Sequence, residues 1–311
     1  MQADEMHPQA KAAVKRQAYM PLPHGRLGVK FARLLTRPVM WVQNRNPPPV
    51  GATADLAIPG PGGDVDARLY RPDASERSPT VVFFHGGGFV FGSIETHDRL
   101  CRRLVRESDC AVLSVDYRLA PEHPFPAAVE DAYAAVEWVA ANPDAVGGTG
   151  DVAVAGDSAG GNLAAVAALM AAERDGPALA YQTLVYPGVG VDEDAPSVRE
   201  HAGVVLSEAD LAFFADAYYG SDVHRRNPYA DPTNAADVSG VAPATVLTAG
   251  FDPLRDGGRA YAEQLVRDGV DTRYVNHPDM PHGFLTMPGV DRARDAIAAL
   301  GDDLAAVLDA H

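Results

Sequence analysis

Three side chains of the sequence have the types and positions needed for acyl transfer, and the first is a serine. Ser158 is the centre of Gly156-Asp157-Ser158-Ala159-Gly160, between the apolar run 152–155 and the helix-like segment 162–172. Small residues two before and two after a serine are typical of a nucleophile elbow, because they let strand and helix approach closely. The strained turn lifts the hydroxyl above the sheet and directs the first helical amides at a bound carbonyl oxygen. The pentapeptide alone could also be an ordinary turn.

Two further residues lie where an acid and a base would be needed. Asp252 follows the strand-like segment 245–249, and His282 follows another at 272–276. Side chains at the carboxyl ends of parallel strands gather at one edge of a sheet, and the chain order Ser, Asp, His is that of α/β hydrolases. Asp252 could instead cap a helix, and Asp256 is a competing carboxylate. We prefer Asp252 because it lies nearer the end of its strand.

A glycine loop follows a third strand-like segment. The sequence His85-Gly86-Gly87-Gly88-Phe89 comes directly after the apolar run 80–84. Three consecutive glycines let backbone amides approach a ligand with no side chain in the way. The loop lacks the glycine patterns of nucleotide-binding loops, so a nucleotide site is not expected there.

Strand-like and helix-like segments alternate through most of the chain. Short apolar strands that alternate with helices predict right-handed crossovers and a mostly parallel sheet with helices on both faces, the α/β class. The predicted strands are 55–58, 65–70, 80–84, 111–115, 152–155, 179–186, 245–249 and 272–276, and the predicted helices are 95–108, 127–141, 162–172, 258–268 and 292–309.

Two parts of the chain do not follow this alternation. Residues 1–50 form an arm with helical patches that ends in three prolines, and residues 188–227 insert an aromatic-rich helix, 207–219, between two strands. We predict a catalytic core of residues 51–187 and 228–311, with the arm and the insertion forming a lid. The aromatic helix could equally be additional core.

Composition limits the partners and the compartment. Of the 311 residues 47% are hydrophobic and 22% charged, and the formal net charge of −16 opposes nucleic acid and anionic membranes. Residues 1–17 lack the apolar centre of a signal peptide, and no stretch has the length of a transmembrane helix. Cys101 and Cys110 show no metal-ligand spacing. We therefore expect a cytoplasmic chain with no nucleic-acid partner, no metal and no organic cofactor.

The motifs together resemble the signature set of the bacterial hormone-sensitive-lipase-like carboxylesterases. The matching segments are HGGG at 85–88, DYRLAPEHPFPAA at 116–128, GDSAGGN at 156–162, DPLRD at 252–256 and HGF at 282–284. The resemblance runs from about residue 65 to the end, and it implies an eight-stranded α/β-hydrolase core under a helical cap. One departure is Gly257, where that family usually has glutamate.

The resemblance also implies roles for particular residues. Ser158 would be the nucleophile, His282 the base and Asp252 the residue that orients the base. An oxyanion hole would be formed by three backbone amides, those of Gly87, Gly88 and Ala159. The implied substrates are esters with short and medium acyl chains. Five aromatic residues could line the acyl pocket or be ordinary core: Phe89, Phe91, Phe213, Phe214 and Tyr218.

These features predict a serine carboxylesterase that works through an acyl-enzyme, and alternatives stay open. An amidase or formamidase would use the same triad, because the two reactions differ mainly in how the leaving group is protonated. A non-catalytic small-molecule receptor on this fold typically lacks the base, whereas His282 is present here. The last strand and the C-terminal helix could form the contact of a homodimer.

Overall fold

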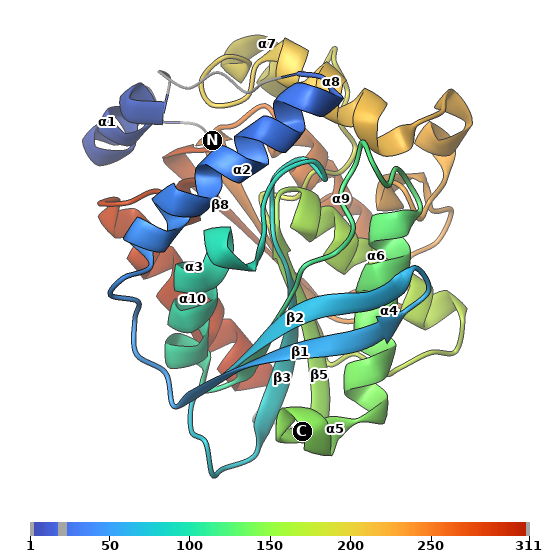
Figure 1. The fold of residues 1–311 in the computed structure, drawn as a ribbon. Coiled ribbons are helices and arrows are strands. Elements are labelled where there is room, and N and C mark those ends of the chain that lie inside the picture. Colours follow the sequence, from blue (N-terminus) through green and yellow to red (C-terminus); the bar gives the residue numbers. More distant parts are fainter. Residues whose placement is uncertain (1–2, 18–23, 309–311) are drawn as a thin grey trace.

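One eight-stranded sheet organises the molecule (Figure 1). The computed structural model describes residues 3–17 and 24–308. The strands lie in the order β1-β2-β4-β3-β5-β6-β7-β8. Their bounds are β1 Ala52–Gly60, β2 Gly63–Arg71, β3 Ser78–Phe84, β4 Ala111–Val115, β5 Gly148–Asp157, β6 Tyr181–Val185, β7 Ala244–Phe251 and β8 Thr272–Pro281.

The sheet is mostly parallel, as the alternating pattern predicts. Strands β4, β3, β5, β6, β7 and β8 pair in parallel, whereas β2 is antiparallel to both β1 and β4. The antiparallel pair arises because β1 and β2 form a hairpin, with Gly60 opposite Gly63. The predicted α/β-hydrolase fold with an eight-stranded sheet is therefore confirmed.

Helices cover both faces of the sheet. On one face α4, α6 and α9 pack on the strands, and on the other α3 and α10 do so. The helical bounds are α1 Pro8–Gln17, α2 Arg26–Gln43, α3 Ile94–Ser108, α4 Ala127–Ala141, α5 Pro143–Val146, α6 Ala159–Glu173, α7 Pro196–His201, α8 Glu208–Tyr219, α9 Arg255–Arg267 and α10 Asp291–Leu308, with the short 3-10 helices η1 Asp222–Arg226, η2 Pro232–Asn234 and η3 Phe284–Thr286.

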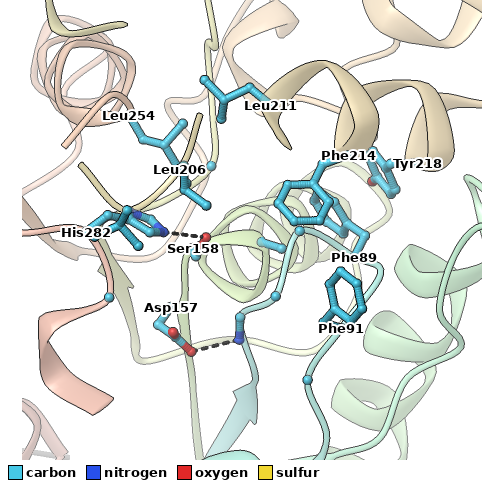
Figure 2. Close-up of a pocket in the computed structure, with 18 of the residues that line it drawn as sticks. Phe89, Phe91, Asp157, Ser158, Leu206, Leu211, Phe214, Tyr218, Leu254 and His282 are labelled. Atoms are coloured by element: carbon cyan, nitrogen blue, oxygen red, sulfur yellow. Dashed lines mark hydrogen bonds between the residues drawn. The ribbon is translucent and has the colours of Figure 1, made fainter. Parts of the chain in front are cut away.

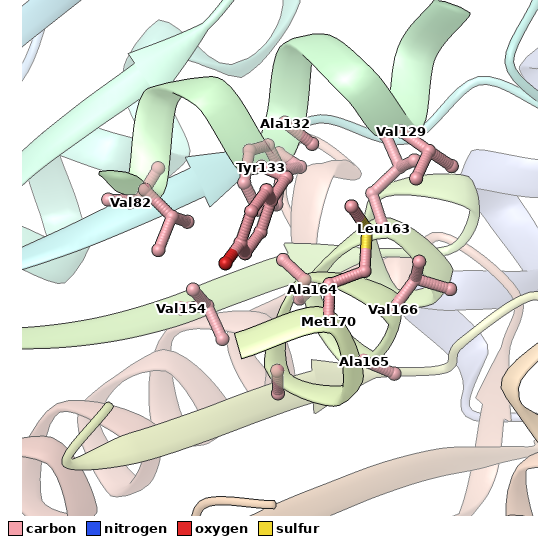
Figure 3. Packing of buried hydrophobic residues seen from close by; sticks show 14 of the residues in the cluster. Val82, Val129, Ala132, Tyr133, Val154, Leu163, Ala164, Ala165, Val166 and Met170 are labelled. Carbon is pink, nitrogen blue, oxygen red and sulfur yellow. The ribbon is translucent and has the colours of Figure 1, made fainter. Parts of the chain in front are cut away.

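The strand residues divide between the two cores by simple alternation. Val82 and Phe84 of β3 belong to the core under α4 and α6, whereas Val81 and Phe83 belong to the core under α3 and α10. Both sets are needed because a central parallel strand is covered on both faces. Figure 3 shows Val82 packed among residues of α4 and α6. Helix α6 is buried around almost its whole circumference, which explains why its sequence lacks a polar stripe.

The insertion at 188–227 contains α7, α8 and η1. Helix α8 begins with a capping box, in which the Ser207 hydroxyl accepts from the Asp210 amide and the Asp210 carboxylate accepts from the Ser207 amide. The two helices of the arm lie in different places. Helix α1 is fixed beside α10, where Gln9 donates to Asp291 at 2.8 Å. Helix α2 lies beside α3, and the preceding His24 contacts Asp210 of α8 at 3.0 Å.

Several elements extend beyond their predicted ends. Helix α6 begins at Ala159, directly after the serine, and β8 continues to Pro281, directly before the histidine. Residues 1–2 and 18–23 of the predicted arm, and residue 309 of the predicted last helix, lie outside the described residues. Among the helices that the structure describes, none is both long and apolar enough to cross a membrane.

Candidate active site

Ser158 occupies a strained turn between β5 and α6. Its backbone angles are φ 55° and ψ −118°, in the left-handed half of conformational space that side chains rarely enter. Glycine is required on both sides of this turn. A Cβ on Gly160 would collide with the carbonyl oxygen of Phe84, and one on Gly156 would collide with the carbonyl oxygen of Gly160. The Ser158 amide donates to the Val185 carbonyl at 2.9 Å, which ties the turn to the neighbouring strand β6.

Three side chains form one hydrogen-bonded chain at the carboxyl ends of β5, β7 and β8. The Ser158 Oγ lies 3.0 Å from His282 Nε2, and His282 Nδ1 lies 2.8 Å from Asp252 Oδ2. The other oxygen of Asp252 accepts the backbone N–H of Leu254 at 2.8 Å. Since a carboxylate can only accept, Nδ1 of the neutral imidazole donates and Nε2 is left to accept from the serine hydroxyl. Asp252 and His282 are both buried, so few water molecules compete for these bonds.

Asp256, the competing carboxylate, has different partners. It accepts the Ser197 amide at 2.9 Å and the Arg255 Nε at 3.0 Å. Burial alone would raise the pKa of Asp256, but the hydrogen bonds and the charge of Arg255 hold that pKa below its usual value. Asp256 therefore joins α9 to α7 of the insertion, and Asp252 is the carboxylate in contact with His282.

The glycine loop lies beside Ser158 in a conformation that requires glycine. Gly87 has φ 128° and Gly88 has φ 62°. A Cβ on Gly88 would collide with the ring of Phe214, and one on Gly87 with the carbonyl of Phe91. The Gly87 carbonyl accepts the amides of Val90 at 3.1 Å and Phe91 at 2.8 Å. The loop is thus folded back on itself beside the serine.

Asp157 holds the start of this loop, a role that the sequence pattern did not reveal. Its Oδ1 accepts the Gly86 amide at 2.8 Å (Figure 2) and lies 3.1 Å from Nε2 of His97. Burial alone would raise the pKa of Asp157, but the charge and hydrogen bond of His97 and the Gly86 amide outweigh it and hold that pKa below its usual value. The residue before the serine thereby connects the elbow to the glycine loop.

An apolar cavity of about 360 Å³ opens over Ser158 and His282. Four of the five predicted aromatic residues line it. Figure 2 shows aliphatic side chains on the His282 side of Ser158 and aromatic ones on the other side. The residues that form these two walls are Leu206, Leu211, Phe89, Phe91, Phe214 and Tyr218.

Phe213 is the predicted aromatic residue that does not line this cavity. Its ring stacks on His24 at a centroid distance of 4.7 Å. The physical reason is that successive residues of a helix point about 100° apart. Because Phe214 points into the cavity, the preceding residue Phe213 points toward the arm.

Sequence reasoning missed the aliphatic part of the cavity. Leu211 and Phe214 lie three residues apart and Tyr218 four further on, so they share one side of α8. That spacing was visible in the sequence, but the helix has apolar residues on other sides as well. Leu206 precedes the helix and had no signal of its own.

The ranges 3–17 and 24–308 contain no cluster of three or more His, Cys, Asp or Glu arranged to hold a metal ion. Cys101 and Cys110 are both buried. Burial raises the pKa of the Cys101 thiol well above its ordinary value, which keeps it in the unreactive protonated form.

Comparison with known proteins places these observations in a family. A model of the alpha/beta hydrolase fold matches residues 81–286. Carboxylic ester hydrolase LipN of Mycobacterium tuberculosis is 46% identical over an alignment of 243 residues that covers 75% of this chain and 64% of that protein. Esterase LipI of the same organism is 43% identical over 76% of this chain and 76% of that protein. The solved structure of a hyperthermophilic esterase from the archaeon Pyrobaculum calidifontis has a TM-score of 0.91 and 42% identity, over 97% of this chain and 98% of that one.

Fold and site together define the class, that of the α/β hydrolases. The chain belongs to the hormone-sensitive-lipase-like carboxylesterase family of that fold and is a carboxylic ester hydrolase. The resemblance found in its sequence motifs is therefore confirmed.

Proposed function

We propose that the protein is a serine carboxylesterase for esters with short to medium acyl chains. The observation that carries this proposal is the hydrogen-bonded chain from Ser158 through His282 to Asp252 at the floor of an apolar cavity. A nucleophile, a base and an orienting acid are the groups that acyl transfer needs. The apolar walls give an acyl chain a place to bind.

In the proposed first step the Ser158 hydroxyl attacks the ester carbonyl and His282 Nε2 accepts its proton. Asp252 holds the Nδ1–H tautomer and stabilises the imidazolium that forms. His282 then donates the proton to the departing alcohol, leaving an acyl-serine. In the second step a water molecule attacks the acyl-serine as His282 accepts its proton. His282 returns this proton to Ser158 Oγ as the bond between that oxygen and the acyl carbon breaks and the acid leaves.

The negative charge on the carbonyl oxygen is assigned to three backbone amides, those of Gly87, Gly88 and Ala159. Ala159 is the first residue of α6, and the first amides of a helix have no carbonyl partner within it. The Ser158 amide donates to Val185 instead, so it is already engaged. Removing one such donor typically costs about 10²- to 10³-fold in kcat.

The acyl chain is assigned to the cavity that Phe89, Phe91, Phe214 and Tyr218 help to line. Its volume of about 360 Å³ lies near the lower end for small-molecule sites, roughly 300–1,000 Å³. Phe213 is left out of this assignment because of its position on the outer side of α8. A cavity of this size fits the proposed preference for short and medium chains.

The test is hydrolysis of p-nitrophenyl esters of increasing acyl length, with the matching p-nitroanilides alongside. We expect ester cleavage that declines for long chains, and a loss of at least about 10⁴-fold in kcat for Ser158→Ala. Preferential cleavage of anilides would instead identify an amidase. A folded protein that binds these compounds without turning them over would be the non-catalytic receptor.

We further propose a division into a core of residues 51–187 and 228–311 and a cap. Helix α8 of the insertion 188–227 supplies one wall of the cavity, and Val29 of α2 in the arm 1–50 packs in one apolar cluster with Phe213 and Phe214 of α8. No residue of α1 lines the cavity, which restricts the arm's share of the cap to α2. Limited proteolysis tests this division: cleavage in the insertion should change the acyl-length preference before it unfolds the core.

Two further parts of the proposal concern assembly and compartment. Strand β8 ends the sheet order and exposes much of its length, which supports a homodimer through β8 and α10. Gel filtration over a range of concentrations that gives only monomer would refute this homodimer.

We assign the protein to the cytoplasm, an assignment supported by two buried thiols. The acidic composition keeps nucleic acid out of the proposed partners.

A further inference from the structure

Helix α2 directs its apolar residues away from the protein. Leu27 is 84% exposed, Trp41 65% and Phe31 62%, whereas Val29 is fully buried. The rest of the outward side is also apolar and about half exposed: Leu34, Leu35, Val39 and Val42. A surface helix of a globular protein normally has the opposite arrangement, with its apolar stripe toward the core. We call these seven exposed residues the outer face of α2.

The orientation of α2 is fixed by polar contacts on its inner side. The guanidinium of Arg33 donates to the carbonyls of Val90 at 2.8 Å and Ala120 at 2.6 Å, and it pairs with Glu122 at 3.0 Å. Just past the end of the helix, the side-chain amide of Asn44 donates from Nδ2 to the backbone carbonyl of Glu95 at 2.8 Å. Rotating the helix to bury its outer face would break these bonds, so the apolar side stays outward.

The helix is also basic, although the protein is acidic. Its 18 residues include Arg26, Lys30, Arg33 and Arg37 and no Asp or Glu, in a chain of net charge −16. Arg45 follows the helix, and its guanidinium lies 4.1 Å from the centre of the Trp41 ring. An exposed apolar face with tryptophan and arginine at its border is the pattern of helices that lie in a membrane interface.

The outer face borders a groove that leads to the active site. This groove, of about 1,700 Å³, lies between α2 and α3 and is lined by Phe31 and Trp41. Phe91, Gly92 and Thr96 line the groove and also the cavity over Ser158. A surface that bound α2 would therefore lie at the entrance to the cavity. Figure 1 shows α2 at the outside of the molecule, next to α3.

We propose that α2 docks the protein onto an anionic lipid surface. The seven apolar side chains insert between lipid head groups, and the exposed Arg26 and Lys30 pair with anionic head groups. A second copy of the chain fits less well, because pairing two outer faces would bring two basic helices together. The overall negative charge opposes approach by the rest of the surface, so it also orients the protein with α2 toward the lipid.

The first experiment is co-sedimentation with vesicles of phosphatidylglycerol and phosphatidylcholine, and with vesicles of phosphatidylcholine alone. We expect binding to the anionic vesicles that weakens in 0.5 M salt, because the charge pairs are screened. In a Trp138→Phe background, Trp41 fluorescence should shift to shorter wavelength on binding, because the exposed indole enters the lipid. No binding to anionic vesicles, or equal binding to both kinds in low and high salt, would overturn the proposal.

Variants separate the apolar contribution from a general effect of mutation. Leu27 and Leu34 line neither the groove nor the cavity. Leu27→Ser with Leu34→Ser should lower the vesicle partition coefficient by more than about tenfold. The matched control is Val223→Ser with Val266→Ser, two residues that are 75% and 58% exposed elsewhere, and it should bind normally. Both double variants should hydrolyse a water-soluble acetate ester normally, which shows that they are folded.

The basic contribution is tested in the same way. Arg26→Gln with Lys30→Gln should lower binding about fivefold for each charge removed. The control, Arg259→Gln with Arg267→Gln, removes two exposed charges from α9 and should leave binding unchanged. Equal losses for both pairs would contradict docking by α2. If sedimentation equilibrium showed a dimer that Leu34→Ser dissociates, a second copy would cover the face and the lipid proposal would be wrong.

Discussion

The carboxylate of Asp157 accepts the backbone N–H of Gly86 at 2.8 Å. This bond joins the residue before the proposed nucleophile to the first glycine of the proposed oxyanion loop. The two segments are far apart in sequence and meet because β3 and β5 are adjacent parallel strands. The position of the loop amides relative to Ser158 therefore depends on one buried side chain.

Replacing Asp157 should reduce kcat much more than it changes KM. In Asp157→Ala the Gly86 amide loses its partner, the loop shifts, and we expect kcat to fall by about 10²-fold, the usual effect of losing an oxyanion donor. Asp157→Asn retains an acceptor oxygen, so its kcat should lie between those of wild type and Asp157→Ala. Asp151→Ala, at the other end of β5, is the control. Steady-state kinetics with a butyrate ester measure the effect, and an unchanged kcat would exclude this role.

The same carboxylate should contribute to stability in a way that depends on pH. Its pKa is below the usual value in the folded protein, so folding favours the charged form. The contribution is complete above the unfolded-state pKa of about 3.9 and is lost as the pH falls through the folded-state pKa. The free energy of unfolding of wild type minus that of Asp157→Asn should decrease as the pH falls below about 4. Urea unfolding at several pH values measures it; a difference that grows in acid would contradict the assignment.

Asp252 and Asp256 provide a matched pair of carboxylates. Asp252→Asn should lower kcat by about 10⁴-fold, because an amide can donate to Nδ1 and hold the wrong imidazole tautomer. Asp256→Asn should leave kcat within about tenfold of wild type and mainly lower Tm, because Asp256 contacts Ser197 and Arg255. Parallel measurement of kcat and Tm separates the two roles. The reverse result would transfer the orienting role to Asp256.

Phe214 and Phe213 are a matched pair for testing whether the cavity side of α8 contacts the acyl chain. Phe214→Ala enlarges the cavity, and we expect kcat/KM for longer esters to rise about fourfold for each additional methylene that becomes buried. Phe213→Ala, on the outer side of α8, should leave the chain-length profile unchanged. Profiles from acetate to laurate measure the effect. Identical profiles for both variants would move the acyl chain away from α8.

The sequence patterns predict the fold and the position of the three polar residues for a physical reason. Buried parallel strands are short apolar runs, and their carboxyl ends meet at one edge, so Ser158, Asp252 and His282 were placed from local pattern alone. The residues of the cavity wall were harder to predict from the sequence, because Leu206 and Phe214 become neighbours of Phe89 only through the tertiary fold. Periodicity likewise indicates that a helix is amphipathic, but it cannot show that the Arg33 side of α2 faces inward.

Gly257 gives a prediction about stability. A Cβ at this position would collide with the carbonyl oxygen of Val189, so α9 and the start of the insertion are in close contact. Gly257→Ala should lower the free energy of unfolding by about 1–3 kcal/mol, the usual cost of overpacking. Gly240→Ala, where the nearest atom is 3.5 Å away, should change it by less than about 1 kcal/mol. Urea unfolding distinguishes them. Equal stability of the two variants would show that the contact can relax.

The position of His282 directly after β8 makes activity sensitive to local opening. β8 is the last strand of the sheet, paired with β7 and, at Pro278 and Asp279, bonded to the backbone amides of Ala3 and His7, so it can separate while the central strands remain folded. Such an opening removes the base from the serine long before the whole chain unfolds. On heating, inactivation should therefore precede the loss of circular dichroism signal. A contact that covers this edge would extend the working lifetime of the enzyme without altering its chemistry.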